Sequence, residues 1–302
     1  MHFDKRIGPG SPTSGKEYNM STLAEYRKMP HWSTSSLATF VNCSLQYAFR
    51  YVYHLAPEHN PVAPLLGRSF HKAATWMAAK RKKGEAFNPA VAEDFFSESF
   101  LVECKSAGEI SFGDGETESS LDWQGRSLIA CLCESWPDEQ VLETATAFCV
   151  PLISYGGIRL SEKPIIGELD LLVRNAEGKT AIVDWKSAAR KWPADKADKE
   201  LQATVYLYSF CAERRVRLDD VGFRFDVLTK TKVPSYMQYH TTRKYDDLHR
   251  LLWLVQSIEK AIKAESFIPN QNSFCCSDCV YGSACEEWHR RQSKTISFAK
   301  AS

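Results

Sequence analysis

The chain has no long hydrophobic run. No stretch approaches the roughly 18 to 20 uninterrupted apolar residues that a membrane span requires, because charged residues interrupt each candidate. The N-terminus also lacks the apolar core of a secretory signal, and its glycine, proline and serine content is typical of a flexible segment, which we expect over residues 1–30. These absences predict a cytoplasmic protein with no membrane partner.

An excess of charge of one sign is absent as well. The chain has 38 Lys and Arg against 37 Asp and Glu, so its formal net charge is +1. A nucleic-acid surface would therefore have to be a local patch rather than a property of the whole protein. Internal repeats are missing, and 44% hydrophobic with 25% charged residues is ordinary globular usage. This composition excludes collagen-like, coiled-coil and globally disordered chains.

Cysteine, in contrast, is abundant, with ten residues in the chain. A reducing compartment would keep these thiols from forming a disulfide framework, so some of them need another explanation. Cys276, Cys279 and Cys285 follow a C-x2-C-x5-C spacing, which lets three thiolates reach one metal centre from a short loop. A fourth ligand is missing locally, because Cys275 is adjacent to Cys276 and neighbouring residues rarely reach the same centre comfortably.

Hydrophobic periodicity divides the chain into helices and strands. Apolar residues at helical spacing predict helices over 34–54, 65–82, 90–106, 118–135, 196–213 and 243–265. Short β-branched or apolar runs predict strands over 145–155, 164–174, 179–188, 221–230 and 235–242. The order β-β-β-α-β after an initial helix predicts an α/β fold with a mixed central sheet flanked by helices. We expect one domain over 31–290, with a helical insertion at about 84–140 and a tail over 291–302.

Two acids and a lysine stand out in the predicted strands. Asp170 lies in GELDLLV, and Asp184 begins the run Asp184-Trp185-Lys186. The number of residues between the two acids suits adjacent strands of a hairpin. Because side chains alternate along a strand, Asp184 and Lys186 point the same way and Trp185 points to the other face. Carboxylates in apolar strands cost desolvation energy, which a divalent cation and its phosphate ligand could offset. A surface salt bridge is the plain alternative for an isolated Asp-x-Lys.

Further polar residues accompany these three. Gln202 and Tyr206 lie one turn apart on one face of the next predicted helix. His71 lies on an earlier helix, where Gly67 in the preceding turn would allow close backbone approach. The full set of His71, Asp170, Asp184-Trp185-Lys186 and Gln202 to Tyr206 resembles the motifs of the PD-(D/E)xK nuclease superfamily. The closest resemblance is to its RecB-like branch, which includes the nuclease domains of RecB and AddB and the CRISPR-associated iron-sulfur exonucleases.

The resemblance implies a restriction-endonuclease-like core with a metal site. Asp170 and Asp184 would bind Mg²⁺ or Mn²⁺, with His71 as a further ligand and the carbonyl group of Trp185 contributing from the backbone. Hard oxygen ligands suit Mg²⁺, which binds through one or two carboxylates and substrate phosphate. For His71 taken alone, ordinary packing or surface exposure is the alternative.

Catalytic roles are implied in the same way. Lys186 would position or polarise the attacking water and stabilise charge on the phosphate. Gln202 and Tyr206 would orient the active site and the DNA backbone, although helix-face packing is the alternative for each. Glu168 shares strand parity with Asp170 and is a further, weaker candidate acid.

The resemblance also extends to the cysteines. In the iron-sulfur members of this branch, one N-terminal cysteine joins three C-terminal ones around a [4Fe-4S] cluster. Cys43 would then complete the set with Cys276, Cys279 and Cys285 and join the two ends of the domain. Ser44 departs from the family, which often has proline there. Four thiolates can also hold zinc, which spacing alone does not distinguish, and unligated thiols are the remaining alternative.

Basic and aromatic residues near the site are candidate DNA contacts. The candidates are Lys80, Arg81, Arg190, Lys191 and Trp192. A run of charged residues usually forms a solvent-exposed face without a partner. This is the alternative to DNA binding both for Lys80 with Arg81 and for Arg190 with Lys191. Trp76, Trp185 and Trp192 lie among these charges and could stack on the exposed bases of a single strand.

Together these features predict a Mg²⁺- or Mn²⁺-dependent deoxyribonuclease, acting as an exonuclease on single strands or DNA ends. Its partners would be DNA and a helicase, recombination or CRISPR adaptation complex. The rivals are a catalytically idle DNA-binding or assembly module and a zinc-stabilised structural protein. Asp170, Asp184 and Lys186 favour an enzyme, because a binding module has no need of buried carboxylates facing a polyanion.

Overall fold

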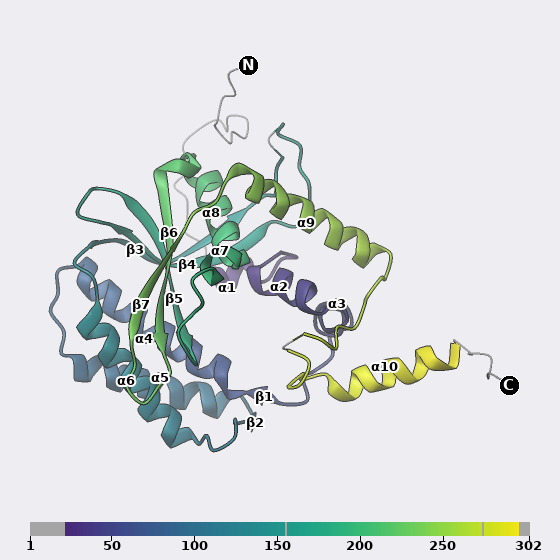
Figure 1. Ribbon diagram of the computed structural model, residues 1–302, viewed down its shortest axis with the longest axis horizontal. Helices are drawn as coiled ribbons and strands as arrows, with labels where there is room; N and C mark the ends of the chain where they lie inside the picture. Colours follow the sequence, from purple (N-terminus) through teal and green to yellow (C-terminus); the bar gives the residue numbers. More distant parts are fainter. Residues whose placement is uncertain (1–21, 155, 274, 296–302) are drawn as a thin grey trace.

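A five-stranded sheet forms the centre of the computed structural model, which describes residues 22–154, 156–273 and 275–295 (Figure 1). The strands, in spatial order, are β3 (Gln140–Val150), β4 (Ile165–Arg174), β5 (Thr180–Ala188), β6 (Val221–Thr229) and β7 (Tyr236–Thr241). The pair β5 and β6 is parallel, and the other neighbouring pairs are antiparallel. The predicted α/β fold with a mixed sheet is confirmed.

Helices cover both faces of this sheet (Figure 1). One face packs against α4 (Val62–Lys82), α5 (Pro89–Ser106) and α6 (Glu118–Ser135). The other face packs against α2 (Thr34–Asn42), α8 (Leu201–Arg214) and α9 (Tyr245–Lys263). The helix α8 connects the parallel strands β5 and β6, as a parallel connection requires. The sheet therefore separates two hydrophobic cores.

The alternation of side chains along β5 feeds both cores. Val183 and Trp185 belong to the cluster under α4, α5 and α6, whereas Ile182 belongs to the cluster under α8. Trp185 is only 1% exposed, and its ring lies 5.6 Å from that of Trp136 and 6.4 Å from that of His71. Trp185 is therefore a core residue, and the expectation that it could stack on a base is wrong.

The termini carry short helices. The helix α1 (Leu23–Tyr26) begins after a capping box at Thr22, and α10 (Gly282–Thr295) ends the described chain. Residues 1–21 of the segment expected to be flexible lie outside the described residues. Residues 296–302 of the expected tail lie outside them as well. No helix in the described part is long and apolar enough to span a membrane.

Three predicted boundaries differ from the structure. The helix expected over 34–54 is interrupted at Cys43, which has extended φ and ψ of −160° and 105° between α2 and α3 (Ser44–Tyr47), and a π-helical turn follows over Ala48–Val52. The helix expected over 196–213 divides at Glu200 into α7 (Lys196–Lys199) and α8. The strand expected over 145–155 lies earlier, because β3 starts at Gln140 and ends before Pro151. Tertiary contacts described below cause the first two breaks.

Two helical glycines differ in what surrounds them. A Cβ atom on Gly125 of α6 would lie 1.8 Å from the buried ring of Phe96, whereas a Cβ atom on Gly67 of α4 would have no atom within 4 Å. The close backbone approach expected at Gly67 is therefore not made by any described part of the chain. At Gly125 the approach is real and lets α5 and α6 pack together.

These surroundings predict opposite effects of one substitution. We expect Gly125→Ala to lower the free energy of unfolding by about 1–3 kcal/mol, because overpacking outweighs the gain in helix propensity. Gly67→Ala is the matched control and should be neutral or stabilising by up to about 1 kcal/mol. Urea unfolding of both variants measures the difference, and equal effects would contradict the packing described here.

Candidate active site

The strands β4 and β5 separate before they end. Their ladder stops at the pair Leu171 and Val183, and beyond it β4 stays paired with β3 while β5 stays paired with β6. Asp170 and Asp184 are the next residues on the two strands and therefore face each other where the sheet splits. The main-chain N–H of Trp185 donates to Asp170 Oδ2 at 2.9 Å instead of continuing the ladder. This fork positions the two carboxylates.

Asp184 forms a closed triangle with Lys186 and Gln202. Lys186 Nζ lies 2.6 Å from Asp184 Oδ2 and donates to Gln202 Oε1 at 2.7 Å. Gln202 Nε2 in turn donates to Asp184 Oδ1. The Asp184 side chain is 1% exposed and that of Lys186 is 28% exposed, so the ammonium group is the more accessible one. The triangle joins β5 to the first turn of α8.

Asp170 pairs with His71 of α4, whose Nδ1 lies 3.1 Å from Asp170 Oδ2. Burial alone would raise the pKa of Asp170, but the charges of His71 and Lys186 outweigh it and hold that pKa below its usual value. The pKa of His71 is correspondingly raised, because attraction to Asp170 overcomes the effect of burial. Asp170 is therefore the acid of the pair that ionises more readily.

Asp184 and Lys186 respond differently to the same burial. Burial raises the pKa of Asp184 to about 6, the charge of Asp170 adds to the rise, and Lys186 opposes it. Burial would lower the pKa of Lys186, but Asp184 and Asp170 together raise it. Lys186 is therefore an ammonium group at neutral pH and not a base.

Tyr206 and Glu168 lie at the margin of this cluster. Tyr206, one turn after Gln202, is buried, and its ring packs edge-on against Phe148 of β3 and Phe223 of β6. Burial and the nearby aspartates raise its pKa well above the ordinary value, so it stays a neutral phenol. Glu168 is half-buried, and burial together with Asp170 raises its pKa. Tyr206 thus contributes to the core that supports α8.

The donor set fits a divalent cation, although it is not a preformed cage. Among the described residues, no three His, Cys, Asp or Glu side chains already converge as metal ligands. Asp184 Oδ2 is nevertheless buried without a hydrogen bond of good geometry, although Lys186 Nζ lies close to it. Two facing carboxylates are the donors that Mg²⁺ and Mn²⁺ prefer, and the imidazole of His71 lies beside them. His71, Asp170, Asp184 and the carbonyl group of Trp185 could hold such an ion.

The pattern of residues gave no indication of Arg243, which fixes the α8 end of the site. Its side chain is buried, and its guanidinium donates to the hydroxyl of Thr204 at 2.7 Å and to the carbonyl oxygens of Ala197 and Glu200 at 3.1 and 2.8 Å. Arg243 therefore provides donors for the backbone carbonyl groups left free at the break between α7 and α8, which lies two residues before Gln202. The stretch Thr-Thr-Arg-Lys after β7 resembles an ordinary surface turn in the sequence.

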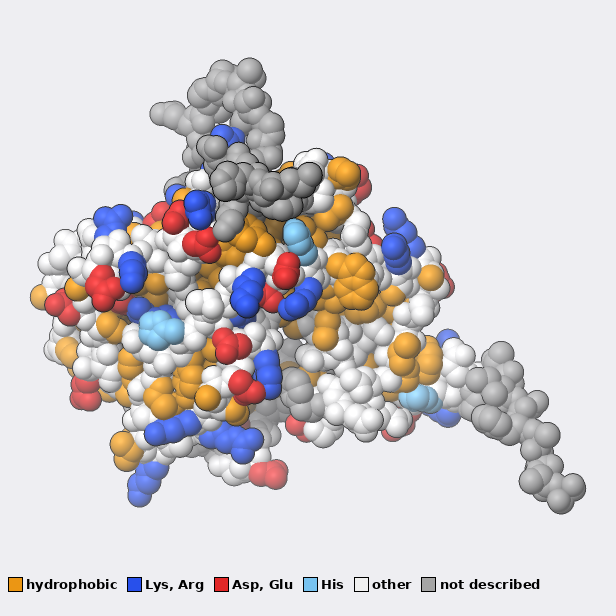
Figure 2. All heavy atoms as spheres, turned by 45° about the horizontal axis from the view of Figure 1, so that its top comes forward, with side chains coloured by type: hydrophobic (Ala, Val, Ile, Leu, Met, Phe, Trp, Pro, Cys, Tyr) orange, Lys and Arg blue, Asp and Glu red, His pale blue; other side chains and the backbone are white. Residues whose placement is uncertain are grey.

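The candidate DNA-binding residues have unequal surroundings. Arg190 and Lys191 are exposed just beyond β5, and no ion pair to either is found among the described residues. Lys80 Nζ pairs with Glu85 at 2.6 Å, and Arg81 lies over the ring of Trp136 at 5.1 Å. On the face shown in Figure 2, basic side chains lie among acidic and apolar ones rather than in one continuous surface. This agrees with the near-zero net charge.

Trp192 is anchored rather than free. Its half-buried ring packs against Phe225 at 5.1 Å and Tyr239 at 5.6 Å, and its carbonyl oxygen accepts a hydrogen bond from the Tyr239 hydroxyl. Lys196 Nζ lies 4.9 Å from the centre of the ring. These contacts hold the segment that carries Arg190 and Lys191. Trp76 is similarly engaged, in a stack with Phe95.

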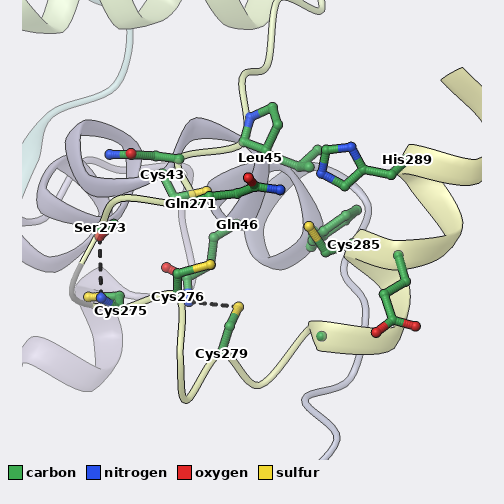
Figure 3. Close-up of a pocket in the computed structure, with 15 residues that line it drawn as sticks. Cys43, Leu45, Gln46, Gln271, Ser273, Cys275, Cys276, Cys279, Cys285 and His289 are labelled. Atoms are coloured by element: carbon green, nitrogen blue, oxygen red, sulfur yellow. Dashed lines mark hydrogen bonds between the residues drawn. The ribbon is translucent and has the colours of Figure 1, made fainter. Parts of the chain in front are cut away.

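The four predicted cluster cysteines line one cavity. Cys43, Cys276, Cys279 and Cys285 line a cavity of about 220 Å³, with Cys275 also at its wall. Figure 3 shows how these side chains lie. Burial raises the pKa of Cys279, and the neighbouring thiols of Cys43 and Cys276 add to this rise. The thiols are therefore close enough to affect one another, although they do not converge on a single point among the described residues.

Hydrogen bonds already join the two ends of the domain at this cavity. The hydroxyl of Ser44 accepts from the main-chain N–H of Ile268 at 2.7 Å and donates back to its carbonyl oxygen at 3.2 Å. Asn270 Nδ2 donates to the carbonyl oxygen of Asn42 at 2.8 Å. These bonds explain the interruption of the helix at Cys43. They also give Ser44 a role that proline, which the family often has there, could not fill.

Comparison with known proteins identifies the family. Residues 31–286 match the PD-(D/E)XK nuclease superfamily, and the chain belongs to it. The structure is similar to that of a proposed exonuclease from Eubacterium rectale, with a TM-score of 0.51, 16% identity, and coverage of 89% of this chain and 94% of that chain. A likeness to the protein SSO0001 is weaker, with a TM-score of 0.42, 13% identity, and coverage of 88% and 92%. No curated protein sequence matches the chain.

The buried position of Arg243 predicts a large effect of its removal. We expect Arg243→Met to lower the free energy of unfolding by about 3 kcal/mol, because it strands buried carbonyl and hydroxyl groups. Arg250→Met is the control: that side chain is 76% exposed and pairs with Asp247, so the change should stay within about 0.5 kcal/mol. Urea unfolding measures both free energies. A similar small effect at each position would contradict the stabilising role of the Arg243 hydrogen bonds.

Proposed function

We propose that this chain is a Mg²⁺- or Mn²⁺-dependent deoxyribonuclease. The observation that carries the proposal is the meeting of Asp170, Asp184 and Lys186 at the fork between β4 and β5. Membership of the PD-(D/E)XK nuclease superfamily supports the same conclusion from the sequence. A catalytically idle binding module is less consistent with two buried carboxylates that face each other, one of them with an oxygen that accepts no hydrogen bond of good geometry.

His71, Asp170, Asp184 and the carbonyl group of Trp185 would hold the cation. Bound there, the cation would lower the pKa of a water molecule and neutralise charge that grows on the phosphoryl oxygens. His71 orients the carboxylate of Asp170 through their 3.1 Å contact. The Trp185 N–H holds the same carboxylate from the other strand, so its position does not depend on the cation.

Lys186 would act as a fixed positive charge. Its ammonium group remains protonated beside two acids, so it would stabilise the phosphate in the transition state instead of accepting a proton. Gln202 holds it by accepting one of its hydrogens while donating to Asp184. Tyr206 would act indirectly, by packing the helix that carries Gln202 against the sheet.

Arg190 and Lys191 are the most favourable phosphate contacts. They follow Lys186 by four and five residues, are exposed, and extend from the strand end that carries the site. Trp192 would keep their segment in place through its core contacts. Lys80 and Arg81 remain candidates, although each already has a partner within the chain.

We propose further that the enzyme is an exonuclease that acts on single strands or DNA ends. A protein of similar fold is described as a proposed exonuclease, which supports this choice over an endonuclease. A helicase, recombination or CRISPR adaptation partner stays a prediction from the resemblance of the sequence.

We also propose that Cys43, Cys276, Cys279 and Cys285 bind a [4Fe-4S] cluster. Cys43, Cys276, Cys279 and Cys285 line one cavity, as the ligands of a single centre require. Four separate thiolates can hold a [4Fe-4S] cluster or a zinc ion. The resemblance of the cysteine spacing to the iron-sulfur members of the RecB-like branch favours the cluster.

The nuclease assignment predicts a specific pattern of loss. With Mn²⁺ and labelled linear single-stranded DNA, Asp184→Asn and Lys186→Met should lower the cleavage rate by at least about a hundredfold, because the first removes a charged ligand of the cation and the second removes the positive charge beside the reacting phosphate. Lys179→Met, at the exposed turn of the same hairpin, should leave the rate unchanged. A chelator should abolish cleavage. Circular single strands should resist if the enzyme needs an end, and full activity of both site variants would end the assignment.

The cluster assignment predicts composition and colour. Anaerobically purified protein should be brown and contain about four irons and four acid-labile sulfides per chain. Cys276→Ser should lose most of both, whereas Cys275→Ser, at the wall of the same cavity, should retain them. Colourless protein with zinc and no sulfide would contradict the cluster and favour the zinc alternative.

A further inference from the structure

A glutamine side chain reaches into the cysteine cavity. Gln46 lies on α3, three residues after Cys43, which has extended backbone angles and precedes that helix. Gln46 Nε2 donates to Cys279 Sγ at 3.5 Å (Figure 3). The short segment from Cys43 to Gln46 therefore supplies both a thiol of the proposed centre and a hydrogen-bond donor to another thiol.

We infer that Gln46 is a positioning residue of this centre: its amide N–H holds the Cys279 sulfur and stabilises the negative charge that the sulfur carries as a ligand. The inference rests on the proposed metal centre. A sulfur that binds a metal as a thiolate carries negative charge, and the half-buried Cys279 has little water around it to stabilise that charge. A donor aimed at the sulfur offsets part of this cost, and such outer donors also orient the ligand.

The donor is specific to one of the four thiols. Among the described residues, no side-chain amide donates to Cys43, Cys276 or Cys285, and the sulfur of Cys43 instead faces the carbonyl oxygen of Ile268 at 4.0 Å. Removing the Gln46 amide should therefore weaken the binding of the centre by the Cys279 sulfur and leave binding by the other three thiols unchanged.

The amide is held in place by a rigid backbone. Leu45 and Tyr47, its neighbours on α3, are buried, and the main-chain N–H of Leu45 is within 3.4 Å of the carbonyl oxygen of Ile268. Ser44 adds the two hydrogen bonds described above. Gln46 can thus position the sulfur rather than follow it, because α3 does not depend on the cavity for its own placement.

The test uses full-length protein purified without oxygen. Gln46→Met keeps the length of the side chain but removes the donor. Gln271→Met alters another glutamine at the wall of the cavity, for which the described part of the chain shows no hydrogen bond to a cysteine. We expect Gln46→Met to release iron to a ferrous chelator about tenfold faster than the unmodified protein. Gln271→Met should release it at the unmodified rate. Equal rates in all three proteins would overturn the inference.

A second measurement separates tuning from simple loosening. In a titration where an electrode supplies one electron per cluster, Gln46→Met should show a more negative midpoint potential, because the lost N–H no longer stabilises the more negative reduced state. An unchanged potential would contradict the role proposed for the amide. The metal-free forms of all three proteins should melt at one temperature. A lower value for metal-free Gln46→Met would instead make Gln46 a residue of the fold and overturn the inference.

The outcomes also distinguish this inference from the proposals beneath it. Unmodified protein without metal would remove the cysteine centre and this inference together, while the nuclease assignment would stand or fall on Asp184 and Lys186. Metal-loaded protein in which Gln46→Met behaves like Gln271→Met would leave the centre intact and overturn the inference alone.

Discussion

The separation of β4 from β5 is the constraint on which the rest of the site depends. Each strand keeps its outer neighbour, so the split costs only the pairing between them, and the carboxylate of Asp170 accepts the main-chain N–H of Trp185 in place of a strand carbonyl. This leaves Asp170 and Asp184 facing each other with no ladder between them. The helices on the two faces then each supply one residue, His71 from α4 and Gln202 from α8.

A second group of buried charges shows why this one is suited to chemistry. On β6, Arg224 lies between Glu139 and Asp226, and these three side chains are no more than 6% exposed. The guanidinium and the Tyr236 hydroxyl give every carboxylate oxygen of that group a donor. The group is closed and joins the segment between α6 and β3 to β6. At the fork, in contrast, Asp184 Oδ2 lacks a hydrogen bond of good geometry, so the site retains binding capacity.

The cysteine cavity and the fork are built from different parts of the chain but follow a common design. In both, a side chain from a neighbouring helix holds a ligand group: Gln202 holds Asp184, and Gln46 holds Cys279. In both, a break in a helix places that side chain. At the break before α8, Arg243 donates a hydrogen bond to the carbonyl oxygen of Glu200. At the break before α3, the hydroxyl of Ser44 accepts a hydrogen bond from the main-chain N–H of Ile268. Helix ends leave backbone groups free for such contacts.

The sequence by itself determined the order of the elements, the mixed sheet and the motif residues at the fork, because periodicity and residue type act locally. Only the tertiary structure decided the breaks at Cys43 and Glu200, the burial of Trp185 and the contributions of Arg243 and Gln46. These depend on partners 39 to 46 residues away for Arg243 and more than 200 away for Gln46. Local patterns cannot report such partners, since a hydrogen bond across the fold depends on where packing brings distant backbone and side-chain groups together.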